Sequence, residues 1–358
     1  DLRKFNYSEK TSSEINNFIK KIESNLGHHI KSVNIMADID EILSVDLSIK
    51  KNFEGNKLSK QDVKFLINEA KNLVKHTYVN QSIIHFIISK FLINNKIYDS
   101  KKINNIKCDN LIIEIKFLLI PIFFLEKFKL IFKKNDILIN KLFYSSFVKS
   151  YNYKENFRNY NKKFFLDIGY KKTCLSIFGE DNLIKILNIP LGGFHITNDL
   201  SKVLKINFNE AESVKKKLNL SNLTFSDQND EIPYSENQSN FELNDKISLD
   251  LVKKIIYARI DEIITLSFKN IYLKEIINES DNSILIFTGN GSKILDKKSI
   301  YLKEEFDCFD EINLFEETSE TICNSGFKFD NFENDFSTMP KNSIKNKGFF
   351  ERMFNLFN

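Results

Sequence analysis

The clearest hydrophobic pattern lies at residues 163–178, where two apolar segments flank a tight turn. Residues 163–168 read as a buried strand that ends in an Asp167-Ile-Gly169 turn, and residues 173–178 read as a second strand. Alternation with a period of two is typical of strands, and Asp-x-Gly turns are common in ordinary hairpins. The pattern predicts a β-hairpin whose turn can also present N–H groups and a carboxylate to a phosphate chain and its metal ion.

Elsewhere the chain alternates between helical and extended patterns. Residues 9–26 and 248–272 carry apolar residues at helical spacing, and Ser59 with Asp62 forms a capping pair that opens a further helix. Strands are expected at 30–37, 41–49, 82–92, 111–117, 186–189 and 283–287. The last of these is apolar throughout, which indicates a strand buried on both faces of a parallel sheet. The mixture predicts an α/β fold.

Composition narrows the classes of function. The 358 residues are enough for two domains or one elaborated α/β domain. The 52 basic and 48 acidic residues nearly balance, which gives no support to nucleic-acid binding. The four Cys and five His show no metal-ligand spacing, and a reducing compartment fits them better than a disulfide framework. The apolar run at 117–125 is too short to span a bilayer.

Two further turns are marked by glycine. Gly192 and Gly193 follow the strand at 186–189, and Gly289 and Gly291 follow the strand at 283–287. Glycine lets a backbone approach a ligand closely, and the N–H groups at a helix start bind anions. The two turns are therefore candidate phosphate or nucleotide contacts.

The order of these three turns resembles that of the actin-like ATPase superfamily, and more narrowly the FtsA family of bacterial cell-division proteins. The stretches that carry the narrower resemblance are Ile189-Pro-Leu-Gly-Gly-Phe-His-Ile-Thr-Asn-Asp-Leu200, Glu210-Ala-Glu-x-x-Lys215 and Ile255-Ile-x-Ala-Arg-x-x-Glu-Ile263. An α+β insert near 54–117 and an amphipathic end of the chain add to it. The resemblance implies an α/β, actin-like two-lobed fold with a small SHS2-like insert subdomain.

The resemblance also divides the chain into segments. It implies the first part of lobe 1 at 1–53, the insert at 54–117, the second part of lobe 1 at 118–162, lobe 2 at 163–329 with a nested subdomain at about 199–282, a flexible linker at 330–347, and an amphipathic membrane-targeting helix at 348–358. The family's first phosphate loop should precede the first helix and is missing from the sequence. Either the chain is a fragment, or the site lacks one of its two phosphate loops.

By the same resemblance, the cleft would bind ATP and Mg²⁺. The implied contacts are Asp167, Gly169 and Thr173 at the γ-phosphate and magnesium, with Asp167 as the metal ligand; Gly192, Gly193, Thr197 and Asn198 at the phosphates; Glu212 and Lys215 at the ribose and adenine; and Gly289, Asn290, Gly291 and Ser292 beside the adenine. The residues alone leave simpler interpretations open: Glu212 and Lys215 as a surface pair, and Tyr170 to Lys172 as exposed hairpin residues.

The resemblance makes the Asp167-Ile-Gly169 turn the family's second phosphate loop. This loop departs from the family at Tyr170-Lys-Lys-Thr-Cys174, where further glycines are usual. Tyr and Lys adopt glycine-only backbone angles at a cost. We therefore expect weak nucleotide binding, little or no hydrolysis, and no catalytic residue.

The end of the chain is amphipathic. The residues expected to contact a membrane are Phe349, Phe350, Arg352, Met353, Phe354 and Phe357. Bulky apolar groups with basic neighbours suit an interfacial anchor on anionic lipid. The alternatives are a tail that docks on its own core or frays.

Taken with the resemblance, these features predict a self-assembling adaptor that tethers FtsZ, the tubulin-like ring protein, to the inner face of the cytoplasmic membrane at the division site, alongside other division proteins. Two alternatives remain: an active ATPase or small-molecule kinase of the same fold, and a cytosolic scaffold of filament or pilus type.

Overall fold

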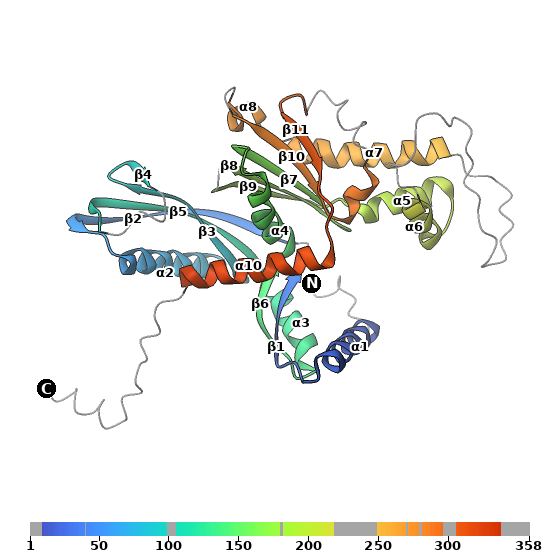
Figure 1. Ribbon diagram of the computed structural model, residues 1–358, viewed down its shortest axis with the longest axis horizontal. Helices are drawn as coiled ribbons and strands as arrows, with labels where there is room; N and C mark the ends of the chain where they lie inside the picture. Colours follow the sequence, from blue (N-terminus) through green and yellow to red (C-terminus); the bar gives the residue numbers. More distant parts are fainter. Residues whose placement is uncertain are drawn as a thin grey trace.

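A computed structural model describes most of the chain (Figure 1), namely residues 9–39, 41–98, 105–179, 182–217, 249–269, 271–278, 281–295 and 306–337. The expected membrane-contacting residues, Phe349 to Phe357, lie outside these ranges, as do most of the expected linker and the stretch at 218–248.

The central element is a five-stranded mixed sheet with the order β11-β10-β7-β8-β9. Its first three strands in the chain form an antiparallel meander, and the last two run parallel to the first. Their bounds are β7 Lys162–Ile168, β8 Thr173–Gly179, β9 Asn182–Ile189, β10 Ser283–Thr288 and β11 Glu311–Leu314. The predicted hairpin is thus confirmed, and so is the parallel setting of the strand at 283–287.

Both faces of this sheet are covered, which explains why nearly every residue of its three central strands, β10, β7 and β8, is buried. On one face, Phe164 and Leu166 of β7 pack with Ile256 and Ile260 of a long helix. On the other face, Phe165 packs in a second core cluster. The helices on the first face are α5 Gly193–Leu204, α6 Phe208–Lys217, α7 Leu249–Phe268 and the short α8 Leu273–Ile276.

The second face meets α4 Ser145–Tyr153 and α10 Ser319–Ser337, which pack against each other. Phe329 of α10 lies edge-on to Phe147 of α4, with ring centroids 5.5 Å apart. In Figure 1, α10 runs below the central sheet. Because α10 extends to Ser337, residues 330–337, which were expected in a linker, continue a helix instead.

A four-stranded antiparallel sheet, order β2-β5-β3-β4, forms the insert. Its elements are β2 Leu43–Lys57, α2 Lys60–Thr77, β3 Gln81–Ile93, β4 Lys96–Tyr98 and β5 Lys107–Pro121. The predicted cap of α2 is confirmed, because the Asp62 N–H donates to Ser59 Oγ while the Ser59 N–H donates to the Asp62 carboxylate. Strand β2 begins well before the expected boundary at 54, because its ladder with β5 starts at Leu43 and shifts register only between Asn52 and Asn56.

The remaining elements form a smaller unit below the central sheet in Figure 1. They are α1 Glu9–Leu26, β1 Ser32–Ala37, α3 Ile122–Lys133 and β6 Leu138–Tyr144. Strands β1 and β6 pair in parallel, and Ala37, Phe124 and Leu142 join them to α3 in one core cluster. Strand β6 leads directly into α4, followed by a short 3₁₀ turn, η2 Lys154–Phe157. Helix α4 therefore connects this unit to the central sheet.

Candidate functional site

The first and third glycine turns meet where the parallel strands β7 and β10 end. Thr288 pairs with Asp167 as the last partners of the ladder, and the 3₁₀ turn η4 (Asn290–Ile294) follows. A Cβ on Gly289 would lie 2.5 Å from Asp167 Oδ1, and a Cβ on Gly291 would lie 2.5 Å from Ile168 Cγ2. Glycine is needed at both positions because one turn packs directly on the other. The carboxyl ends of parallel strands are also where ligands bind in α/β sheets.

The second glycine turn packs against the same hairpin. A Cβ on Gly192 would lie 2.5 Å from the carbonyl oxygen of Gly169. The N–H of Gly193 donates to that carbonyl at 3.0 Å, and the N–H of Phe194 donates to the Tyr170 carbonyl at 2.6 Å. The first N–H groups of α5 are therefore engaged by the hairpin turn. The Thr173 hydroxyl donates to the Leu191 carbonyl at 2.8 Å, which adds a second contact between the hairpin and the segment before α5.

The N–H groups of the third turn are engaged as well. The Gly289 N–H donates to Glu317 Oε2 at 2.9 Å, and both the N–H and the hydroxyl of Ser292 donate to the Gly289 carbonyl. Asn290 is exposed beside them. The three turns thus lie together, and the N–H groups of Gly193, Phe194, Gly289 and Ser292 all donate to protein acceptors.

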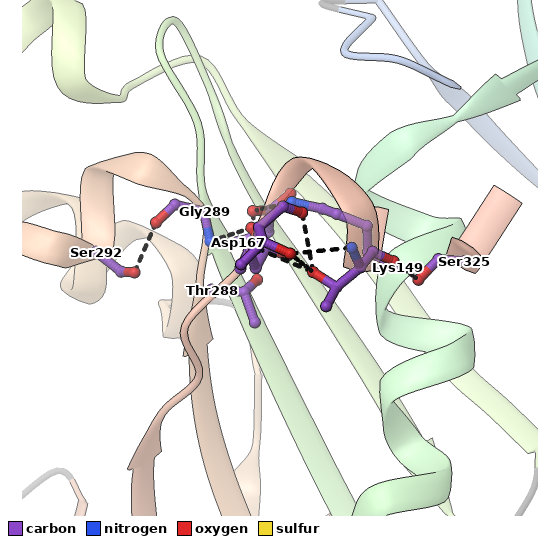
Figure 2. Close-up of polar contacts among 9 residues, drawn as sticks. Lys149, Asp167, Thr288, Gly289, Ser292 and Ser325 are labelled. Atoms are coloured by element: carbon purple, nitrogen blue, oxygen red, sulfur yellow. Dashed lines mark hydrogen bonds and ion pairs between the residues drawn. The ribbon is translucent and has the colours of Figure 1, made fainter. Parts of the chain in front are cut away.

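A cluster of buried charges lies beneath this junction (Figure 2). Lys149 of α4 places its Nζ 2.9 Å from Asp167 Oδ1 and 3.0 Å from Glu317 Oε2. The Thr288 hydroxyl donates to the same Asp167 oxygen at 3.3 Å. The exposed fractions of the three charged side chains are 7% for Lys149, 8% for Asp167 and 5% for Glu317. The Lys149 ammonium therefore forms ion pairs with both carboxylates, and all three groups are largely shielded from water.

The pKa values of the cluster follow from this arrangement. Burial acts to raise the pKa of Asp167, but the Lys149 ammonium and the Ser146 hydroxyl outweigh burial and hold it below its usual value. Burial acts to lower the pKa of Lys149, and the two carboxylates hold it above its usual value instead. For Glu317, burial prevails over Lys149 and raises the pKa. Asp167 and Lys149 are consequently an ionised pair at neutral pH.

A second buried lysine, Lys172, lies near this cluster and contacts a different segment of the chain. Lys172, in the hairpin turn, reaches the loop after β1, where its Nζ lies 3.0 Å from Asp38 Oδ1 and donates to the Ile39 carbonyl. It also lies 4.1 Å from the centre of the Tyr144 ring. The expectation that Lys172 is an exposed hairpin residue is wrong, because only 2% of it is exposed. Tyr170 and Lys171 are exposed as that expectation has it.

A separate polar group joins α5 to α6. Lys215 Nζ donates to the Gly193 carbonyl at 3.0 Å and to Thr197 Oγ1 at 2.7 Å, and it lies 2.7 Å from Glu212 Oε2. Thr197 in turn donates to Glu212 at 2.5 Å. Since Lys215 is buried, the pair is more than the surface pair that spacing alone allows. Asn198, next in α5, is partly buried.

The expected metal site can be tested against these contacts. Among the described residues, no group of three His, Cys, Asp or Glu side chains is placed to hold a metal ion. The Asp167 oxygen that would face such an ion already contacts the Lys149 ammonium. The residues present therefore do not fit a divalent ion bound directly between Asp167 and Glu317.

Sequence reasoning missed Lys149, Glu317 and Asp38. Their partners lie far away in the chain, with Lys149 and Glu317 separated by 168 positions. Lysine in an amphipathic helix gives no local signal of burial, so only the tertiary structure reveals the cluster.

The described helices also include none that is both long enough and apolar enough to cross a membrane.

The fold defines the class of protein. A chain of the PilM–PilN type IV pilus biogenesis complex superposes with a TM-score of 0.56 at 11% identity, covering 87% of this chain and 81% of that one. With its meander-plus-parallel sheet and its inserted second sheet, the chain has an actin-like fold.

Sequence comparison then narrows the class. Residues 164–322 match the family model for the cell division protein FtsA. A stretch of 104 residues is 34% identical to the cell division protein FtsA of Agrobacterium fabrum and equally to that of Rhizobium radiobacter. This match covers 28% of this chain and only 23% of each relative. Over residues 164–322, which hold all three glycine turns, the chain is thus similar to the FtsA family.

Proposed function

We propose that this chain is an actin-like adaptor of bacterial cell division, which holds the FtsZ ring on the inner face of the cytoplasmic membrane. The observation that carries the proposal is the family match over 164–322, because this segment contains the hairpin, α5 to α7 and the Gly289 turn. The likeness to the pilus complex, at 11% identity, concerns the fold alone and does not favour a pilus scaffold.

The adaptor works by binding rather than turnover. ATP is the ligand that the likeness to FtsA over 164–322 implies, and its binding would favour closure of the two lobes and self-assembly. Hydrolysis needs groups that position water and a metal ion, whereas Asp167 is committed to Lys149. An assay of Mg–ATP hydrolysis on the full chain tests this. We expect little or no turnover, and turnover like that of a competent ATPase favours the alternative of an active enzyme.

The membrane link is assigned to the end of the chain. The sequence of residues 348–358 predicts a helix whose apolar face would bind an anionic lipid surface, and polymerisation of the adaptor would add avidity to this short, reversible anchor. Flotation with anionic vesicles, comparing the full chain with a chain that lacks residues 341–358, tests the assignment. We expect only the full chain to float. If the truncated chain floats equally well, the anchor lies elsewhere.

FtsZ is expected to bind the subdomain nested at about 199–282, which includes α5, α6 and α7. The polymer itself and other division proteins are the remaining partners of the proposal. Co-sedimentation with FtsZ polymers is the direct test, and a scaffold of the pilus type would not pellet with them.

A further inference from the structure

Lys149 holds together three segments that are distant in the chain. It projects from α4 and contacts Asp167 at the end of β7 and Glu317 just before α10 (Figure 2). Glu317 also accepts the Gly289 N–H, so the turn after β10 joins the same cluster. A single ammonium thus lies where α4, the end of β7, the Gly289 turn and the segment before α10 meet.

The charges at this junction are unbalanced without Lys149. Two buried carboxylates would face each other, and Glu317 Oε1 is already a buried oxygen with no hydrogen-bond partner among the described residues. Oxygen ligands of this kind are what Mg²⁺ prefers, at about 2.0–2.1 Å. An ammonium at 2.9 and 3.0 Å from the two carboxylates supplies the positive charge that such an ion would otherwise supply.

A second cation would meet strong repulsion in this position. Like charges a few ångströms apart interact strongly where water is excluded. Lys172 adds a further positive charge nearby, inserted between the hairpin turn and Asp38. Lys149 reaches from α4 to the end of β7, and Lys172 reaches from the turn after β7 to the loop after β1.

We propose that Lys149 is the resident cation of the cleft and takes the place of a divalent metal ion between Asp167 and Glu317. The consequence is that closure of the lobes, and binding of a nucleoside phosphate, do not require Mg²⁺ at this position. The second consequence rests on the proposed function. The cation position itself rests on the geometry alone, so the test below uses metal binding and unfolding without nucleotide, lipid or FtsZ.

The experiment compares the full chain with variants in EDTA and in increasing Mg²⁺ or Mn²⁺. For the unaltered chain we expect the same unfolding temperature at every metal concentration. We also expect that any Mn²⁺ it binds is bound equally well by Asp167→Asn, because no Mn²⁺ binds at Asp167. Lys149→Met leaves both carboxylates unpaired. We expect it to unfold several degrees lower in EDTA, to recover with a saturable dependence on metal, and to lose that recovery when Glu317→Gln is added.

The matched control is Lys215→Met, which removes an equally buried lysine from beside a single carboxylate. It should lose stability without recovery by metal. The proposal is overturned if the unaltered chain binds one Mn²⁺ in a manner that Asp167→Asn abolishes, or if Lys149→Met folds and metal does not restore it. Should Lys149→Met fail to fold, Mn²⁺ binding to the unaltered chain and to Asp167→Asn still decides the question.

Discussion

Gly289 and Asp167 touch across the carboxyl ends of β10 and β7, so closely that a Cβ on the glycine would lie 2.5 Å from the carboxylate oxygen. Gly289 also has φ +84° and ψ 162°, a conformation that is essentially restricted to glycine. The close packing of the Gly289 turn on Asp167 therefore requires glycine at position 289. Its closeness also brings the Gly289 N–H within reach of Glu317.

The first prediction concerns this contact. Gly289→Ala should lower the free energy of unfolding by at least about 3 kcal/mol, because backbone strain of about 1–3 kcal/mol is joined by a collision with Asp167. Gly27→Ala is the control, since Gly27 has φ +71° with no atom within 4 Å of the added Cβ. It should cost only about 1–2 kcal/mol. Urea unfolding measures both, and equal losses would show that the contact contributes nothing.

The second prediction concerns the start of α2. Ser59→Ala removes the oxygen that accepts the Asp62 N–H and leaves that donor without its cap. A loss of about 1 kcal/mol in the free energy of unfolding is expected. Ser59→Thr keeps a hydroxyl that can accept from the Asp62 N–H and donate to the Asp62 carboxylate, and it should lose less. If the two variants are equally destabilised in thermal or urea unfolding, the capping bond is not the cause.

The third prediction concerns pH. Burial acts to raise the pKa of Glu212, but hydrogen bonds from Lys215 and Thr197 outweigh it and hold the pKa below the usual 4.5. The ionised pair therefore adds stability that is fully present above pH 4.5 and is lost as pH falls through the lowered pKa. The stability gap between the unaltered chain and Glu212→Gln should shrink over this range. Glu14→Gln, on an exposed position of α1, is the control. A gap that stays constant down to about pH 3 would contradict the assignment.

The fourth prediction concerns the contact between α5 and α7. Arg259 donates two hydrogen bonds to Asp199, at 2.6 Å from Nε and 3.0 Å from Nη2. Arg259→Lys cannot reproduce this fork and should cost about 1 kcal/mol. Arg158→Lys is the control, because Arg158 pairs with Glu155 within one helical turn and is mostly exposed. If Arg259→Lys and Arg158→Lys lower the free energy of unfolding by similar amounts, the paired hydrogen bonds from Arg259 to Asp199 do not account for the loss.

Elements with local signals could be predicted from the sequence. The hairpin at Asp167, the cap at Ser59 and the parallel strand before Gly289 each depend on residues that are neighbours in the chain. The convergence of the three glycine turns was predicted through resemblance to a family, and the structure adds the reason, which is that the turns pack on one another.

The charge cluster could not be predicted in this way. Lysines are usually exposed, whereas Lys149 and Lys172 are buried where other segments of the chain meet them with carboxylates. Polar composition likewise suggested a linker from residue 330, whereas α10 extends to Ser337, with Phe329 anchored among the aromatic rings of α4. Long-range packing decided both cases.

The most direct test of the proposed function is reconstitution on a supported bilayer of anionic lipid, with FtsZ that carries a fluorescent label but no membrane anchor of its own. We predict that FtsZ filaments appear on the bilayer when the full chain is present and stay in solution when residues 341–358 are removed. Filaments that remain in solution with the full chain on the bilayer would contradict the account.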